Sequence, residues 1–120
     1  MTEMKQPKQF VRETTAAEQL VRAICMDYPR RAELIRRGTA EPPVLQTCLL
    51  LNRAVDDAAA QAYDLTRAWA PDFAEIMRTD IADCRGYASS PLSGVMSEGS
   101  YKKYKRMIKR NIARRLGLIG

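Results

Sequence analysis

Apolar residues recur every three to four positions along most of the chain, a spacing that predicts amphipathic helices. The first helix is expected over residues 11–26, with Thr14 or Thr15 as candidate caps at its start. It should end before Pro29, because the residue preceding a proline is disfavoured in the α conformation. Pro29 also suits the first turn of a short second helix, which Gly38 is expected to terminate. The apolar positions of the first helix are Ala17, Leu20, Val21, Ile24 and Cys25.

The longest helix is predicted over residues 41–68, where Pro42 and Pro43 favour a helix start. Alanines at 58–60 and 62 would let another helix approach closely, and the sequence leaves open whether that helix lies in the core or across a dimer interface. The predicted apolar stripe consists of Leu45, Cys48, Leu49, Val55, Ala59 and Ala62.

Pro71 interrupts this pattern, and a further helix is expected over residues 72–84. Its inward-facing side chains should be Phe73, Ile76, Met77 and Ile81. Residues 86–96 are rich in glycine, serine and proline and are therefore predicted to be a loop. The last helix is expected to begin at Ser97 or Ser100, both favourable N-caps, and to run to Leu116 before Gly117.

The fold class that follows is all-α, with about five helices, because no alternating apolar run is long enough for a pair of strands. Residues 1–10 are polar and are expected to form a flexible N-terminus. Residues 11–68 should form an N-terminal helical part, which is a candidate for oligomerisation. Residues 69–120 should form the C-terminal part.

The last helix has two chemically different faces. At the angular spacing of an α-helix, the residues Tyr101, Tyr104, Ile108, Ile112 and Leu116 share one face. The two tyrosines are better suited to anchoring this face in the core than to stacking on a ligand. Most of the opposite face is basic, with Lys102, Lys103, Arg106, Lys109, Arg110 and Arg114.

Positive charge is concentrated in this helix. The chain has 20 lysines and arginines against 14 aspartates and glutamates, a net charge of +6. Residues 101–115 contain eight basic residues and no acid, two more than the net charge, so the rest of the chain carries −2. No acidic residue follows Glu98. Ordinary solvated faces mix both signs, so a basic surface of this kind favours contact with a polyanion such as nucleic acid.

The chain lacks the residues that several kinds of catalytic, metal-binding and phosphate-binding site require. The chain has no histidine, which removes Ser-His and Cys-His nucleophile pairs and the common zinc sites. The six glycines are scattered and form no phosphate-binding loop of the GxGxxG or GxxxxGK[ST] kind. The carboxylate pair Asp56 and Asp57 is expected on a solvated helix face. We therefore expect no enzyme, no catalytic residues, no metal and no cofactor.

The cysteines and the apolar runs indicate the cellular compartment in which the protein is expected. Cys25, Cys48 and Cys84 lie far apart and form no CxxC pair, so they are expected to be small buried side chains in a reducing environment. No apolar run approaches the ~20 residues that span a bilayer, and the N-terminus lacks the apolar region of a signal peptide. The expectation is a cytoplasmic protein without membrane contact.

Three segments together resemble a known family. In the last of them, a serine-led helix carries an aromatic residue, a basic run, an alanine and a closing Leu-Gly-Leu. The combination resembles the RinA-type transcriptional activators of phages and prophages of Gram-positive bacteria, over roughly residues 20–119. The segments are Asp27-Tyr28-Pro29-Arg30-Arg31 with Glu33-Leu34-Ile35, Leu51-Asn52-Arg53-Ala54-Val55-Asp56, and Ser97 through Leu118.

The resemblance implies a helix-turn-helix-like unit related to the DNA-binding end of sigma factors, acting on phage late genes. A sigma-like motif has a regular supporting helix before the turn, whereas this chain has Pro91 and Gly94 there. Either the supporting helix is very short, or residues 72–84 take its place across a long loop. The candidate DNA-binding residues are Ser97, Ser100, Tyr101, Lys102, Lys103, Lys105 and Arg106 at the start of the recognition helix, with Lys109 and Arg110 following.

The sequence therefore predicts a phage or prophage transcriptional regulator that docks its C-terminal helix on double-stranded DNA. A homo-oligomer is expected, and host RNA polymerase is a further candidate partner. Two other functions stay open: a DNA-packaging component resembling a small terminase subunit, and a protein-interaction module without DNA affinity of its own. A basic helix can also follow an RNA backbone. An anionic membrane suits it less, because its apolar face has no tryptophan or phenylalanine.

Overall fold

The computed structural model describes residues 16–63 and 70–119, and all regular structure in these ranges is helical. This confirms the all-α prediction. The expectations for residues 1–10 and for caps at Thr14 and Thr15 lie outside the described residues. The elements are a first helix at residues 16–26, then α2 (Tyr28–Arg37), α3 (Pro42–Ala62), α4 (Ala70–Ala82), the short 3₁₀ helices η1 (Tyr87–Ser89) and η2 (Pro91–Gly94), and α5 (Glu98–Arg115).

Local signals set most helix ends where the sequence predicts them. Gly38 adopts the left-handed conformation after α2, with φ 67°, and its N–H donates to the Leu34 carbonyl. Gly117 does the same after α5, with φ 72°, and the next N–H, of Leu118, donates to the Ala113 carbonyl at 2.8 Å. These bonds satisfy carbonyls that would otherwise lack a partner at the helix end.

The predicted end of α3 near residue 68 is wrong, because the helix stops at Ala62. Tyr63 leaves the helical conformation, with φ −147° and ψ 145°. Its ring stacks on Phe73, with 4.7 Å between the ring centroids, so aromatic packing with α4 replaces a further helical turn. Helix α4 begins at Ala70 rather than at 72, with Pro71 in its first turn, where a proline is tolerated.

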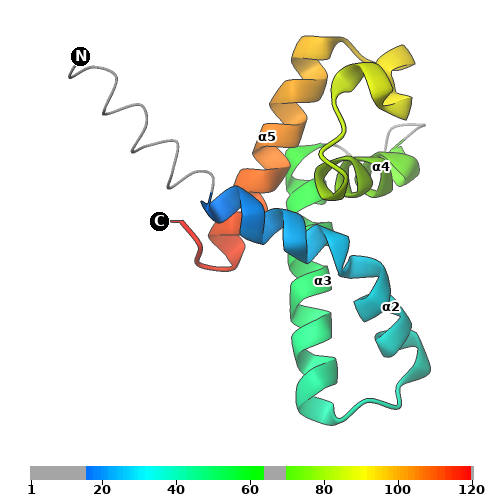
Figure 1. The fold of residues 1–120 in the computed structure, drawn as a ribbon, viewed down its shortest axis with the longest axis vertical. Coiled ribbons are helices and arrows are strands. Elements are labelled where there is room, and N and C mark those ends of the chain that lie inside the picture. The colour runs from blue at the N-terminus through cyan, green and yellow to red at the C-terminus, as the bar shows by residue number, and fades with distance from the viewer. Residues whose placement is uncertain (1–15, 64–69, 120) are drawn as a thin grey trace, which may run out of the picture.

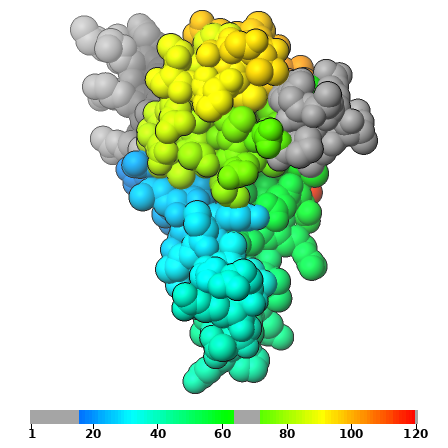
Figure 2. Space-filling model, turned by 90° about the vertical axis from the view of Figure 1, so that its right-hand side faces the viewer, coloured from blue at the N-terminus to red at the C-terminus, as the bar shows by residue number. Residues whose placement is uncertain are grey.

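Helix α3 is the central element of the fold (Figure 1). Its C-terminal half lies in the main core, which the first helix, α4 and α5 complete. Its N-terminal half runs antiparallel to α2, and the two form an arm that projects from the core. Figure 2 shows the arm as the narrow end of the molecule, below the broader part that contains η1 and η2. No helix in the described ranges is long and apolar enough to cross a membrane.

The alanines of α3 face the core, and α5 packs against this face. Ala58, Ala59 and Ala62 are buried in the same cluster as Ile108 and Ile112. The backbones approach closely enough for the Asn111 side-chain amide to donate to the Ala58 carbonyl at 3.4 Å. The core thus takes up these alanines, the first of the two roles that the sequence left open. Helices α3 and α5 share one core, which therefore contains residues of both predicted parts of the chain, 11–68 and 69–120.

A buried arginine joins the first helix to the arm. The side chain of Arg31 is 3 % exposed, and its Nε donates to Oδ1 of Asn52 on α3 at 2.7 Å. Its Nη2 donates to the carbonyl of Ile24, near the negative end of the first helix. Asn52 in turn donates to the Tyr28 carbonyl at 3.3 Å, and the Tyr28 hydroxyl donates to Asp56 at 2.8 Å. These bonds fix the angle between the first helix and α2.

Other side chains depart from the sequence-based expectations. Leu49 was expected in the apolar stripe of α3 but is 46 % exposed, because the arm has only α2 on one side to cover it. Cys25 and Cys48 are buried as expected, whereas Cys84 is exposed in the turn after α4. Cys84 also has a left-handed backbone, with φ 53°. Phe73, Met77 and Ile81 are buried as predicted, and Ile76 packs partly buried against them.

We predict that Asn52→Ala destabilises the protein by about 1.5–3 kcal/mol, because it removes a hydrogen bond to a buried charged group. Arg53→Ala, one position along the same helix, is the matched control, since Arg53 is exposed and has no ion pair among the described residues. Arg53→Ala should change the free energy of unfolding by no more than about 0.5 kcal/mol. Urea unfolding of both variants measures the free energy of unfolding. Equal losses of stability in the two variants would contradict the role of Arg31 in joining the first helix to the arm.

Candidate nucleic-acid interface

Helix α5 is capped at its N-terminus by Ser97. The Ser97 hydroxyl accepts a hydrogen bond from the Ser100 N–H at 3.2 Å, and the two hydroxyl oxygens lie 3.0 Å apart. Of the two predicted starts, Ser97 is therefore the N-cap. Both serines lie at the start of α5, Ser97 exposed and Ser100 partly buried.

The inner face of α5 is anchored by tyrosines. Tyr101 is 1 % exposed, and its hydroxyl donates to Oδ2 of Asp80 on α4 at 2.8 Å. Tyr104 packs edge-on against Tyr63 and Phe73, with centroid distances of 4.9 and 5.9 Å. Tyr101 was a candidate DNA contact, and the structure corrects this, because a buried ring that holds α4 to α5 cannot meet a ligand on the surface.

Four cations form a stripe along the outer face of α5. All four are exposed, and none has an ion pair or hydrogen bond to another described residue. From the 1.5 Å rise per residue, the stripe is about 16 Å long. We call these residues the α5 stripe: Lys103, Arg106, Arg110 and Arg114. Arg114 lies outside the predicted set of contacts, although the helical spacing places it on this face.

The other cations of α5 have partners in the protein. Lys102 pairs with Glu98 at 2.9 Å, one turn earlier on the exposed surface. Lys109 is half-buried and lies 3.6 Å from Glu18 of the first helix. Lys105 is partly buried, and its Nζ donates to the carbonyl of Arg85. Burial lowers the pKa of Lys105, and the charge of Lys109 lowers it further. The cations among the predicted contacts thus fall into two groups: Lys103, Arg106 and Arg110 lie on the exposed stripe, and Lys102, Lys105 and Lys109 have partners within the protein.

The segment between α4 and α5 is tied down by hydrogen bonds. The Tyr87 hydroxyl lies 2.6 Å from the Ser93 carbonyl oxygen and 2.7 Å from that of Met96. The Ser90 hydroxyl accepts from the Leu92 N–H and caps η2, and Leu92 is buried in the core. The interval predicted to be a loop therefore contains two 3₁₀ turns. The element directly before α5 is η2, a single turn, and α4 packs against both η2 and α5.

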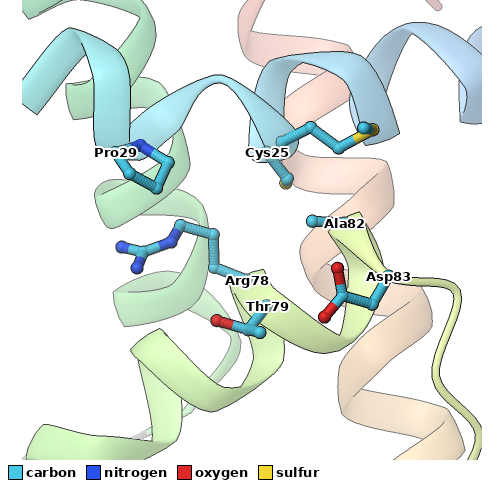
Figure 3. A pocket seen from close by; sticks show the side chains of 7 residues that line it. Cys25, Pro29, Arg78, Thr79, Ala82 and Asp83 are labelled. Carbon is cyan, nitrogen blue, oxygen red and sulfur yellow. The ribbon is translucent and has the colours of Figure 1, made fainter.

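A cavity of about 200 Å³ lies between the first helix, α2 and α4 (Figure 3). Burial raises the pKa of the Cys25 thiol in its wall to about 11, so the thiol is protonated at neutral pH and is a poor nucleophile. Arg78, which lies beneath Pro29 in this view, stacks over the Tyr28 ring at 3.9 Å from the centroid. In the described part of the chain, no group of three or more His, Cys, Asp or Glu side chains could hold a metal ion.

Comparisons with known proteins found no match among family models, curated proteins or solved structures. The resemblance to RinA-type activators therefore stays a prediction. The segments that carry it have defined structural roles here. The first two, residues 27–31 and 51–56, are joined through Arg31, Asn52 and Tyr28, and the third is α5 with its cap.

We predict that Tyr101→Phe destabilises the protein by about 1–3 kcal/mol near neutral pH, because Asp80 is fully buried and loses its hydrogen bond. Burial and the hydrogen bond to Asp80 raise the pKa of Tyr101 from 10.0 to about 12. The folded protein thus holds this proton more tightly than the unfolded chain does. The stabilisation is complete below pH 10 and is lost as the pH rises from 10 to 12.

Urea unfolding of both proteins across this pH range provides the measurement. The difference in unfolding free energy between wild type and variant should shrink as the pH approaches 12. Cys25 also has a raised pKa but is present in both proteins, so it cancels in the difference. A difference that stays constant with pH would contradict the role given to the Tyr101 hydroxyl.

Proposed function

We propose that this protein binds duplex DNA through the α5 stripe and regulates transcription. The observation that carries the proposal is the stripe itself. It consists of four exposed cations that have no carboxylate partner among residues 16–63 and 70–119, on a helix whose opposite face is fixed in the core. Nucleic acid is the polyanion that such a surface fits best.

The contrast with α2 supports this reading of the charges. Helix α2 also exposes arginines, but each has a carboxylate partner nearby. Arg30 pairs with Asp27 at 2.6 Å, and both Arg36 and Arg37 pair with Glu33. An ordinary solvated face has this mixed character. No described carboxylate pairs with the α5 stripe, so a bound polyanion would supply its counter-charges.

The dimensions of α5 suit the major groove of DNA. A helix with its side chains is about 10–12 Å across, and the major groove is about 12 Å wide. The groove can therefore accept the outer face while the inner face stays in the core. Arginine and lysine on that face can contact phosphates and the guanine edge.

The regulatory role rests on the family resemblance as well as on the helix. We propose that the protein acts in the cytoplasm as a phage or prophage regulator. A homo-oligomer and a contact with host RNA polymerase are further predictions of the same kind. The oligomeric state and the contact with RNA polymerase are tested by measurements other than DNA binding.

The test is binding to random-sequence duplex DNA, measured by fluorescence anisotropy over a salt series. The wild type should show log K falling with log salt at a slope of about −0.9 per phosphate contacted. In the combined variant Lys103→Gln, Arg106→Gln and Arg110→Gln, affinity at low salt should be strongly reduced. The slope should become shallower by up to about 2.7, which corresponds to three phosphate contacts.

The matched control removes the same charge from the arm, with Arg36→Gln, Arg37→Gln and Arg53→Gln. The ion pairs of Arg36 and Arg37 are exposed and contribute little to stability, and Arg53 has no ion pair among the described residues, so both triple variants should keep the wild-type helical circular dichroism. The control should bind DNA with a wild-type slope. Equal losses of DNA affinity in both variants would indicate a non-specific charge effect and overturn the assignment of the DNA-binding surface to α5. Single-stranded DNA and RNA, measured alongside, should bind less tightly than duplex.

A further inference from the structure

A second cavity, of about 330 Å³, lies beside α5, where it meets the first helix and the turn after α4. Four cations from three separate segments line it. Arg22 comes from the first helix, Arg85 from the turn after α4, and Lys105 and Lys109 from consecutive turns of α5. Among the described residues of the lining, Glu18 is the one with a carboxylate. We call this cavity the basic pocket.

The cations of the basic pocket are incompletely neutralised. Arg22 uses Nε to donate to the Ala82 carbonyl at 2.9 Å, which leaves its two terminal nitrogens without a partner in the described part of the chain. Lys105 donates to a carbonyl rather than to a carboxylate. Lys109 lies 3.6 Å from Glu18, beyond the distance of a strong charged hydrogen bond. Only Arg85 has two carboxylates near it, those of Asp80 and Asp83.

The pKa of Lys105 also indicates that the positive charge of the pocket is incompletely neutralised. Its pKa is lowered by burial and by the positive charge of Lys109. The Asp80 carboxylate opposes this shift but does not cancel it. An anion between Lys105 and Lys109 would remove the repulsion, so the pocket is arranged to gain from a negative ligand.

We propose that the basic pocket binds a phosphate group. The Arg22 guanidinium, whose two terminal nitrogens have no partner in the described part of the chain, offers a planar donor fork that matches phosphate oxygens. The ammonium groups of Lys105 and Lys109 add point charges, and Arg85 adds a positive charge that Asp80 and Asp83 partly offset. None of the described residues that line the pocket is aromatic, so its recognition of a ligand rests on charge rather than on stacking with a base. The group can be a phosphodiester of bound nucleic acid or the phosphate of a small molecule.

The position of the pocket favours a phosphodiester. Lys105 and Lys109 are sequence neighbours of Arg106 and Arg110, so the pocket borders the α5 stripe along one edge. A duplex held on the stripe would bring one strand of its backbone to this edge. A phosphodiester as the ligand rests on the proposed function, namely duplex binding, whereas binding of a free phosphate does not depend on it.

The test uses the full chain and the double variant Arg22→Gln and Lys109→Gln, with the charge-preserving Arg22→Lys and Lys109→Arg as its control. One arm titrates inorganic pyrophosphate at low salt by isothermal calorimetry, without DNA. The other arm measures duplex binding over the same salt series as above. Circular dichroism and urea unfolding confirm that both variants fold.

Loss of pyrophosphate binding in the glutamine variant, with binding kept in the control, supports the phosphate pocket. If the slope of duplex binding also becomes shallower by about 0.9 or more, the source is the DNA backbone. If only pyrophosphate binding changes, the pocket takes a free phosphate. Pyrophosphate binding by a wild-type protein that fails to bind duplex would refute the proposed function and keep the pocket. Wild-type affinity for both ligands in the glutamine variant would overturn the pocket.

Discussion

The close packing of α5 on the alanine face of α3 decides which side of the basic helix is available. Ala58, Ala59 and Ala62 are small enough for the two backbones to approach, and Ile108 and Ile112 fill the space that remains. Because Tyr101 and Tyr104 hold the same face at the other end, α5 cannot rotate without exposing its apolar side chains. The orientation of its cations is therefore a consequence of the core.

This constraint separates the cations of α5 into two groups. The residues that point away from α3 form the stripe, where no described carboxylate offsets their charge. The residues at one edge, Lys105 and Lys109, meet Arg22 and Arg85 from other segments and form the basic pocket. Both groups lie on one helix, so one polyanion can contact them together. The proposals about duplex binding and about the phosphate pocket rest on this arrangement.

Features encoded by neighbouring residues were predictable from the sequence. Gly38, Ser97 and Gly117 end or begin helices through their own backbone preferences, and the two faces of α5 follow from its periodicity. Features that depend on distant partners were not. The end of α3 at Ala62 requires Tyr63 to stack on Phe73, and the burial of Arg31 requires Asn52. The pocket could not be predicted either, because Arg22 lies more than 60 residues before the other three cations in the sequence and only the fold brings the four together.

The most direct test of the central claim is to map the surface that duplex DNA touches. Amide chemical shifts of the ¹⁵N-labelled protein, recorded during titration with a short random duplex, report this residue by residue. The account predicts that the largest changes fall on α5 from Lys103 to Arg114 and on residues bordering the basic pocket, with α2 unaffected. Changes centred on the arm of α2 and the first half of α3, with α5 unchanged, would contradict it.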